Sequence, residues 1–158
     1  MCALRFITNG MLGKLTRWLR MLGHDVEYSG SLDDDKLIDR AKTEKRILLT
    51  RDLRLCQRAI TQGANAFLVD GDTGTGKLAQ LSKRFNFKLE MDVAISRCPK
   101  CNASIESVPI EKVMDRIPKA TILHHNEFWK CQSCEQIYWR GSHWKRIEKT
   151  LREAKEML

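Results

Sequence analysis

The chain has 158 residues, 42% of them hydrophobic, and carries 28 lysines and arginines against 20 aspartates and glutamates, a formal net charge of +8. No apolar run approaches the roughly 18 residues that cross a bilayer, which excludes a membrane-spanning protein. The basic balance favours an acidic partner such as a nucleic acid, although many basic proteins bind nothing anionic.

Strands and helices alternate along the first part of the chain. Residues 3–8 form the first predicted strand, and the helix that follows has one apolar face. This face consists of Met11, Leu12, Leu15, Trp18, Leu19 and Leu22. Further strands are expected at residues 25–28, 46–50 and 65–69, and further helices at residues 33–44, after Asp52 and at residues 77–85. Residues 70–76 (DGDTGTG) are expected to form a turn.

This β-α-β-α-β-α-β-α order predicts an α/β fold with a mostly parallel sheet flanked by helices, because parallel neighbours need crossover connections. The rhythm ends near Ser96, and all three prolines of the chain lie beyond it. We therefore divide the chain into residues 1–95 and residues 96–158, and each part is equally basic.

Four cysteines in the second part form two CxxC pairs, CPKC and CQSC: Cys98, Cys101, Cys131 and Cys134. Two such pairs supply the four thiolates of a closed, tetrahedral, structural zinc site. Because 29 residues separate the pairs, more than the usual ~15–20, we expect an insert between them, with a helix in IEKVMDRI (residues 110–117). The alternatives are two redox motifs or buried thiols.

The remaining cysteines, Cys2 and Cys56, have no such partners and are interpreted as a terminal residue and a core residue. The N-terminus MCALRFITNG lacks the long apolar core of a signal peptide. Together with the CxxC pairs, this favours a reducing, cytoplasmic location.

Polar and acidic side chains follow the predicted strands. They are Asn9, Asp33, Asp34, Asp35, Asp52, Asp70 and Asp72. Functional groups of open α/β sheets gather at the carboxyl ends of the strands, and several carboxylates there could bind Mg²⁺ or Mn²⁺. The alternative is that these residues cap helices or lie in a solvated turn.

Taken in order, the segments GMLGKLTRWLRMLGHDV, RILLTRD, SRCPKCN and YWRGSHW resemble a family of predicted RNases. These join a PIN-like nuclease domain to a C-terminal zinc ribbon, and also occur at the C-terminus of mutator-seven exonuclease homologues. The resemblance covers nearly the whole chain. It implies a PIN-like sheet, followed by a four-cysteine zinc ribbon with a helical insert and a C-terminal helix.

The resemblance also implies a metal-dependent endoribonuclease whose acidic side chains hold one or two Mg²⁺ or Mn²⁺ ions. By motif, Asp34 and Asp52 are carried over as ligands. The next position is assigned first to Asp70 and second to Asp72, because the DGDTGTG loop does not match a fixed pattern.

Asn9 stands where this family usually has an aspartate. An amide offers a neutral oxygen but cannot serve as a general base. The residue therefore marks an engineered inactive variant, a natural loss of activity, or a tolerated change of ligand.

Basic side chains near both candidate sites are expected to contact nucleic acid: Lys14, Arg17, Arg51, Arg140, Lys145 and Arg146. For Lys14 and Arg17 the alternative is a solvated helix face. Near the C-terminus, aromatic and cationic residues are interleaved, a pattern that can stack bases and hold phosphates. Trp144 also continues a helical stripe with Ile147, Leu151 and Ala154, which is more typical of a core residue.

Three of the four histidines, His124, His125 and His143, are interpreted as surface or interfacial residues and not as metal ligands. The reason is that four cysteines already complete a tetrahedron. Two functions remain open. One is an endoribonuclease acting on RNA, with DNA not excluded; the other is a non-catalytic protein that binds RNA, such as rRNA or tRNA, or the ribosome.

Overall fold

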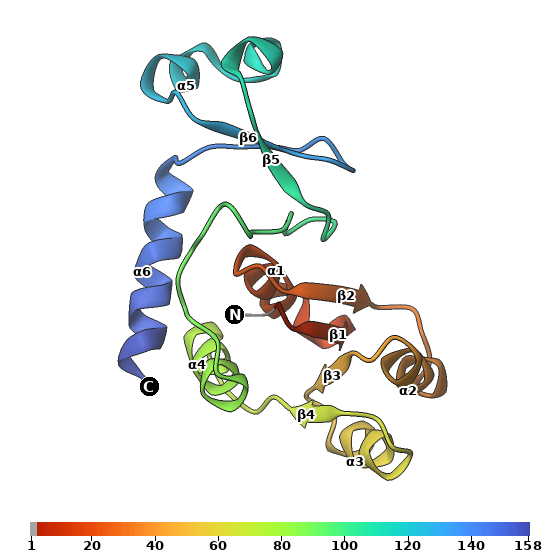
Figure 1. Cartoon of the computed structure of the whole chain (residues 1–158). Helices are drawn as coiled ribbons and strands as arrows, with labels where there is room; N and C mark the ends of the chain where they lie inside the picture. The colour runs from red at the N-terminus through yellow and green to blue at the C-terminus, as the bar shows by residue number, and fades with distance from the viewer. Residues whose placement is uncertain (1–2) are drawn as a thin grey trace.

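A computed structural model describes residues 3–158 of the chain, so Cys2 lies outside the described residues. It has the expected mixed α/β fold, with a parallel four-stranded sheet in the order β2-β1-β3-β4 (Figure 1). The strands of this sheet are β1 (Arg5–Asn9), β2 (Asp25–Ser29), β3 (Ile47–Thr50) and β4 (Ala66–Leu68). Four helices lie between or after them: α1 (Gly13–Met21), α2 (Asp34–Thr43), α3 (Leu53–Thr61) and α4 (Gly74–Phe85).

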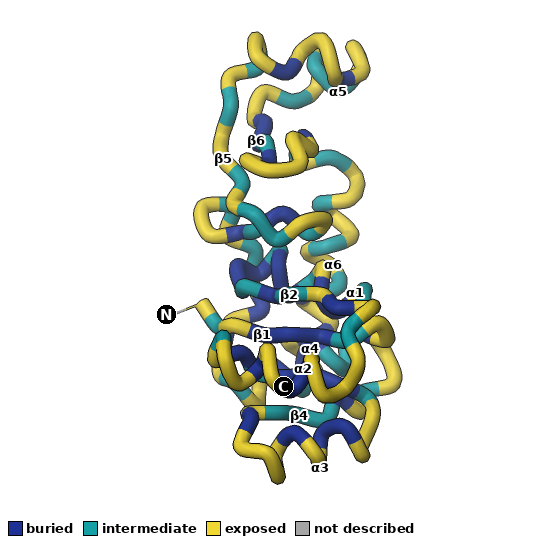
Figure 2. Tube along the Cα trace, turned by 90° about the vertical axis from the view of Figure 1, so that its right-hand side faces the viewer, coloured by how far each residue is buried: buried dark blue, intermediate teal, exposed yellow. Residues whose placement is uncertain are grey.

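The sheet is covered on both faces, because neighbouring residues of a strand point in opposite directions. Phe6 and Leu49 face one apolar cluster with α1 and α4, while Ile7 and Leu48 face the other with α2 and α3. Central strand β1 is accordingly buried over most of its length (Figure 2). We call residues 3–95 the N-terminal lobe.

Local side chains explain several helix ends. Asp33 and Asp52 accept hydrogen bonds from backbone N–H groups in the first turns of α2 and α3, as expected of N-caps. After α1 the chain turns at Gly23, whose φ of 97° and close approach to Ile95 suit glycine alone.

A second, antiparallel sheet, in the order β5-β6-β7, follows the lobe. Its strands are β5 (Ile105–Val108), β6 (Phe128–Cys131) and β7 (Ile137–Tyr138). Two 3₁₀ turns and the short helix α5 (Lys119–His124) lie between β5 and β6. We call residues 96–141 the cysteine module; it stands at one end of the lobe (Figure 1).

The last helix, α6 (Ser142–Glu156), runs back from the cysteine module beside α4 (Figure 1). Its residues Leu151 and Ala154 are buried in the same cluster as Phe6. The helix therefore follows the cysteine module in sequence but packs on the lobe. Along residues 3–158, no helix is both long enough and apolar enough to cross a membrane.

Three details of the sequence prediction were wrong. Residues 110–117 form the two 3₁₀ turns Ile110–Lys112 and Met114–Arg116 rather than an α-helix. Proline at each flank restricts this segment, since Pro118 disfavours a helical Ile117. Helix α4 begins at Gly74 instead of Lys77, because Thr73 caps it. Met11 is 64% exposed and lies in a 3₁₀ turn before α1 rather than on its buried face.

Candidate metal centre and sheet edge

The two CxxC pairs converge in the cysteine module. The Sγ atoms of Cys98, Cys101, Cys131 and Cys134 all lie within 4.8 Å of one another. Cys98 and Cys131 are buried. Four thiols at this spacing are the soft donor set that a tetrahedral structural zinc ion requires. The prediction of a four-cysteine metal cluster is therefore confirmed at the level of ligand geometry.

Polar groups contact the sulfurs of Cys131 and Cys98. Burial opposes ionisation of Cys131, but backbone N–H donation from Cys134 and Ser133 outweighs it and lowers the pKa of this thiol to about 7. The Tyr138 hydroxyl lies 2.9 Å from the sulfur of Cys98, and burial together with this contact raises the pKa of Tyr138. Tyr138 thus stays protonated and can donate to a Cys98 thiolate, as outer partners of metal ligands do.

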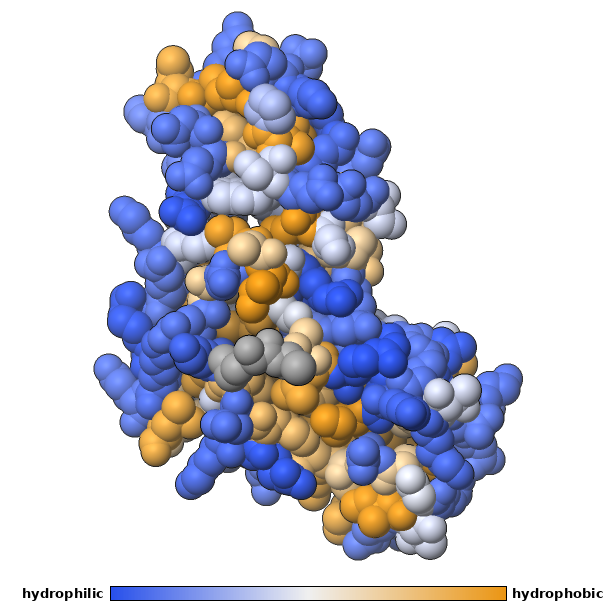
Figure 3. All heavy atoms as spheres, in the orientation of Figure 1, coloured by the Kyte–Doolittle hydropathy of each residue, from blue (hydrophilic) through white to orange (hydrophobic). Residues whose placement is uncertain are grey.

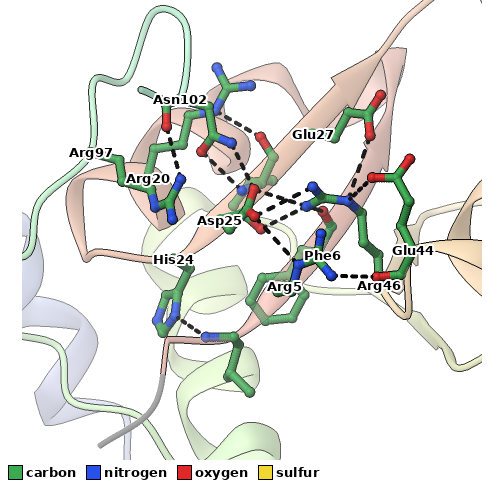
Figure 4. Close-up of polar contacts among 12 residues, drawn as sticks. Arg5, Phe6, Arg20, His24, Asp25, Glu27, Glu44, Arg46, Arg97 and Asn102 are labelled. Carbon is green, nitrogen blue, oxygen red and sulfur yellow. Dashed lines mark hydrogen bonds and ion pairs between the residues drawn. The ribbon is translucent and has the colours of Figure 1, made fainter. Parts of the chain in front are cut away.

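The first CxxC turn is bound directly to the edge of the parallel sheet (Figure 4). Asn102 accepts a hydrogen bond from the backbone N–H of Val26 at 3.0 Å and donates to Asp25 at 2.8 Å. Arg20 of α1 donates to the carbonyl oxygen of Pro99, between the first two cysteines, at 3.0 Å. Hydrogen bonds therefore link the four-cysteine cluster directly to strand β2 and helix α1.

Asp25 is held as a carboxylate by the neighbouring cation of Arg46. Desolvation raises its pKa, but hydrogen bonds from Arg46 and Asn102 prevail and lower the pKa to about 2. Arg46 is itself buried and also bonds the carbonyl oxygen of Phe6 (Figure 4). Nothing in the spacing of Asp25, Arg46 and Asn102 marked them beforehand, because their contacts join residues 21 to 77 positions apart.

The carboxyl edge of the parallel sheet brings two of the predicted residues together. Asn9 ends β1 and donates from Nδ2 to the Thr50 hydroxyl at 3.1 Å, and the same hydroxyl accepts the backbone N–H of Asp52 at 3.0 Å. The chain leaves this point in opposite directions, from β1 to β2 and from β3 to β4. Asn9 and Asp52 thus flank the topological switch point, where open α/β sheets usually bind ligands. Sequence reasoning did not single out Thr50.

Asp34, Asp70 and Asp72 lie along the same edge, and the first two have side-chain partners of their own. Asp34 pairs with Arg58 at 3.5 Å, and Asp70 accepts from the side chain of Gln80 at 2.7 Å. Asp72 is exposed in the loop before α4. Asp52 caps α3 through Oδ1, which accepts from the backbone of Arg54 and Leu55.

These aspartates are not gathered as the cysteines are. Within residues 3–158, the four cysteines form the one group of three or more potential ligands that meets the 4.8 Å spacing. The edge supplies the hard oxygen donors that Mg²⁺ and Mn²⁺ prefer, so it fits such an ion in chemistry. The present spacing equally fits helix capping and surface ion pairs.

The six predicted nucleic-acid-binding side chains fall into two groups. Lys14 and Arg17 are exposed on α1, whereas Arg51 donates to the carbonyl oxygen of Gly71 at 2.7 Å and so holds the loop that carries Asp70 and Asp72. Arg140, Lys145 and Arg146 are exposed at the start of α6, in the second group. The first group belongs to the N-terminal lobe, and the second lies where the cysteine module continues into α6.

Comparison with known proteins gives one match. The family model described as the Mut7-C RNAse domain matches residues 4–151. No curated protein and no solved structure matches the chain significantly.

Proposed function

Since this chain belongs to the Mut7-C RNAse domain family, we propose that it is a divalent-metal-dependent endoribonuclease that acts on RNA in the cytoplasm. Its active site is the carboxyl edge of the parallel sheet. The observation that carries the proposal is the Asn9–Thr50–Asp52 contact at the topological switch point. The residues at this edge that would hold Mg²⁺ or Mn²⁺ are Asp34, Asp52 and Asp70, with Asp72 as the second choice for the last.

Such an ion, when bound, lowers the pKa of a water molecule and neutralises charge on the phosphodiester. The chain's own residues position the acidic ligands and the substrate. Asn9 and Thr50 fix the backbone before Asp52, Arg51 holds the loop with Asp70, and the exposed cations Lys14 and Arg17 contact phosphates of the substrate.

Position 9 decides the activity under this proposal. Asn9 donates an N–H to Thr50 and brings no negative charge to the edge. An aspartate has the same shape, and the Thr50 hydroxyl can turn its proton toward the new carboxylate. The Asn9→Asp change is therefore compatible with the surrounding structure and adds the missing charge.

The second candidate is a non-catalytic protein that binds RNA or the ribosome through the same basic surfaces. The amide of Asn9 favours it, because an amide cannot accept a proton from the attacking water. An overall charge of +8 supports salt-dependent RNA binding in either case.

The test compares the chain with its Asn9→Asp variant, with and without Asp52→Asn, on single-stranded and structured RNA with Mn²⁺. We expect cleavage to appear with the first change and to vanish with the second. Asp35→Asn in the Asn9→Asp background is the matched control, because Asp35 starts the same helix as Asp34 but lies outside the proposed ligands. If neither the chain nor its Asn9→Asp variant cuts any RNA while both bind it, the proposal of a nuclease is wrong. The chain is then a non-catalytic RNA-binding protein.

A further inference from the structure

A hollow of about 410 Å³ lies between the cysteine module, the lobe and α6. Its walls come from Met21 of α1, the segment from Met91 to Pro99, the second sheet with Trp129, and the start of α6 with Trp144 and Ile147. Its volume is within the ~300–1,000 Å³ of typical small-molecule pockets. Apolar and pale side chains surround this opening in the space-filling view (Figure 3).

The hollow lies against the second sheet. Phe128 points into the small apolar cluster of the insert, and the next residue, Trp129, points to the opposite face. There the segment between the lobe and the module contributes Met91, Val93 and Ser96 to the walls. Trp129 is buried and Trp139 also packs against the cluster of Phe128, and together with the half-buried Trp144 they line the hollow.

One cation, Arg140, lies over two of these indoles, while Trp144 Nε1 donates to Glu148 at 2.7 Å. The guanidinium of Arg140 lies 5.4 Å from the ring centre of Trp129 and 5.1 Å from that of Trp144. Residues 136–147 (QIYWRGSHWKRI) contain three arginines and lysines and no aspartate or glutamate. Helix α6 also begins without a side-chain cap, and the backbone N–H of Trp144 donates to the carbonyl oxygen of Gly141 at 3.0 Å. A ligand with a flat apolar part and an adjacent negative charge fits this combination.

We propose that the hollow holds one unpaired nucleotide of single-stranded RNA, with the base against Trp144 and Trp129 and the phosphate at Arg140 and the start of α6. Unstacked bases are recognised in this way, by aromatic rings and arginine planes. A base in a duplex is stacked on its neighbours and does not enter. This proposal rests on the proposed RNA function and adds a base-binding site remote from the Asn9 edge.

The test measures the anisotropy of two labelled oligonucleotides, a uridine oligomer and the same backbone with abasic internal riboses. The native chain is expected to bind the base-bearing oligomer at least about five-fold more tightly. Trp144→Ala should remove this preference and leave abasic binding unchanged, and Trp144→Phe should largely keep it. Lys149→Ala is the control, since Lys149 is exposed further along α6 and should affect both oligomers equally.

Each other outcome contradicts the proposal in a distinct way. A native chain without preference, or a preference that survives Trp144→Ala, overturns the base site and leaves the proposed RNA function standing. Binding to neither oligomer overturns both. A Trp144-dependent dimer in sedimentation, with an unchanged base preference, assigns the hollow to a second copy of the chain. Equal helix content in circular dichroism confirms that the variants fold.

Discussion

The N-terminal lobe and the cysteine module are held together by different means. Within residues 3–158, the lobe and α6 bury two apolar clusters, of fourteen and eight residues. The cluster of the cysteine module contains four: Val113, Ile117, Phe128 and Ile137. Small domains that lack a sufficient core usually need a metal or disulfide. The lobe can therefore fold on its apolar side chains, whereas the module depends on its four thiols.

The largest expected effect separates the two regions. Replacing Cys98 with serine removes one of four ligands and so weakens a metal-binding free energy that is on the order of 10 kcal/mol for a complete structural site. We expect the module to lose its fixed structure while the lobe keeps its helices. Zinc content and tryptophan fluorescence measure the change, since three of the four tryptophans line the hollow beside the module.

Cys56→Ala is the matched control, because Cys56 is buried in α3, outside the cluster. It should keep about one zinc per chain. A Cys98→Ser variant with native zinc content and native fluorescence would contradict the dependence of the module on its metal.

The next effect concerns the core of the lobe. Burial lowers the pKa of His24 from 6.5 to about 4, and its neutral Nδ1 accepts the backbone N–H of Leu4. Between these pH values the unfolded chain binds a proton here and the folded chain does not. Stability is therefore complete above pH 6.5 and falls as the pH drops toward 4, by about 3 kcal/mol.

Denaturant unfolding of the lobe at several pH values checks this expectation. A His24→Gln variant should be less stable at neutral pH but should lose most of the slope between pH 6.5 and 4. A variant that keeps the native slope would show that His24 is not its source. Asp25, with its pKa of about 2, acts only at lower pH, from about 3.8 downward.

The smallest effect tests the junction of the two regions. Asn102→Gly removes the bonds to Val26 and Asp25 and leaves the positive φ of 75° unstrained. Losing these partners should cost about 1–3 kcal/mol. Asn86→Gly is the control, because Asn86 has a similar φ of 56° at the end of α4, and its effect on the melting temperature should be clearly smaller. Equal effects of the two changes would mean that the junction contributes nothing.

The sequence was sufficient wherever the structure depends on short-range patterns. Two CxxC turns fix the position of two thiols each, and the alternation of apolar strands with apolar helix faces predicts a parallel sheet. Family membership followed from ordered motifs and is confirmed. The 3₁₀ turns of residues 110–117 show the limit, since Ile110, Val113 and Ile117 have helical spacing but lie between two prolines.

Contacts between distant segments could not be predicted in this way. The Asn9–Thr50 bond spans 41 positions, and the Asn102–Asp25 bond spans 77. Both depend on which strands become neighbours. The hollow beside Trp144 depends on several segments at once, from Met21 of α1 to Ile147 of α6. Trp144 was interpreted as a core residue from its helical stripe, yet it is half-buried and lines this hollow.

We propose, as the central claim, that a metal ion bound by the four cysteines holds the cysteine module, whereas the lobe and α6 are held by their apolar clusters. Hydrogen exchange of the zinc-loaded and zinc-stripped protein, followed by mass spectrometry, tests it directly. We expect stripping to expose the backbone amides of β5, β6 and β7, while β1 and β3 keep their protection. Unchanged exchange in the module, or equal loss of protection in both sheets, would contradict the account.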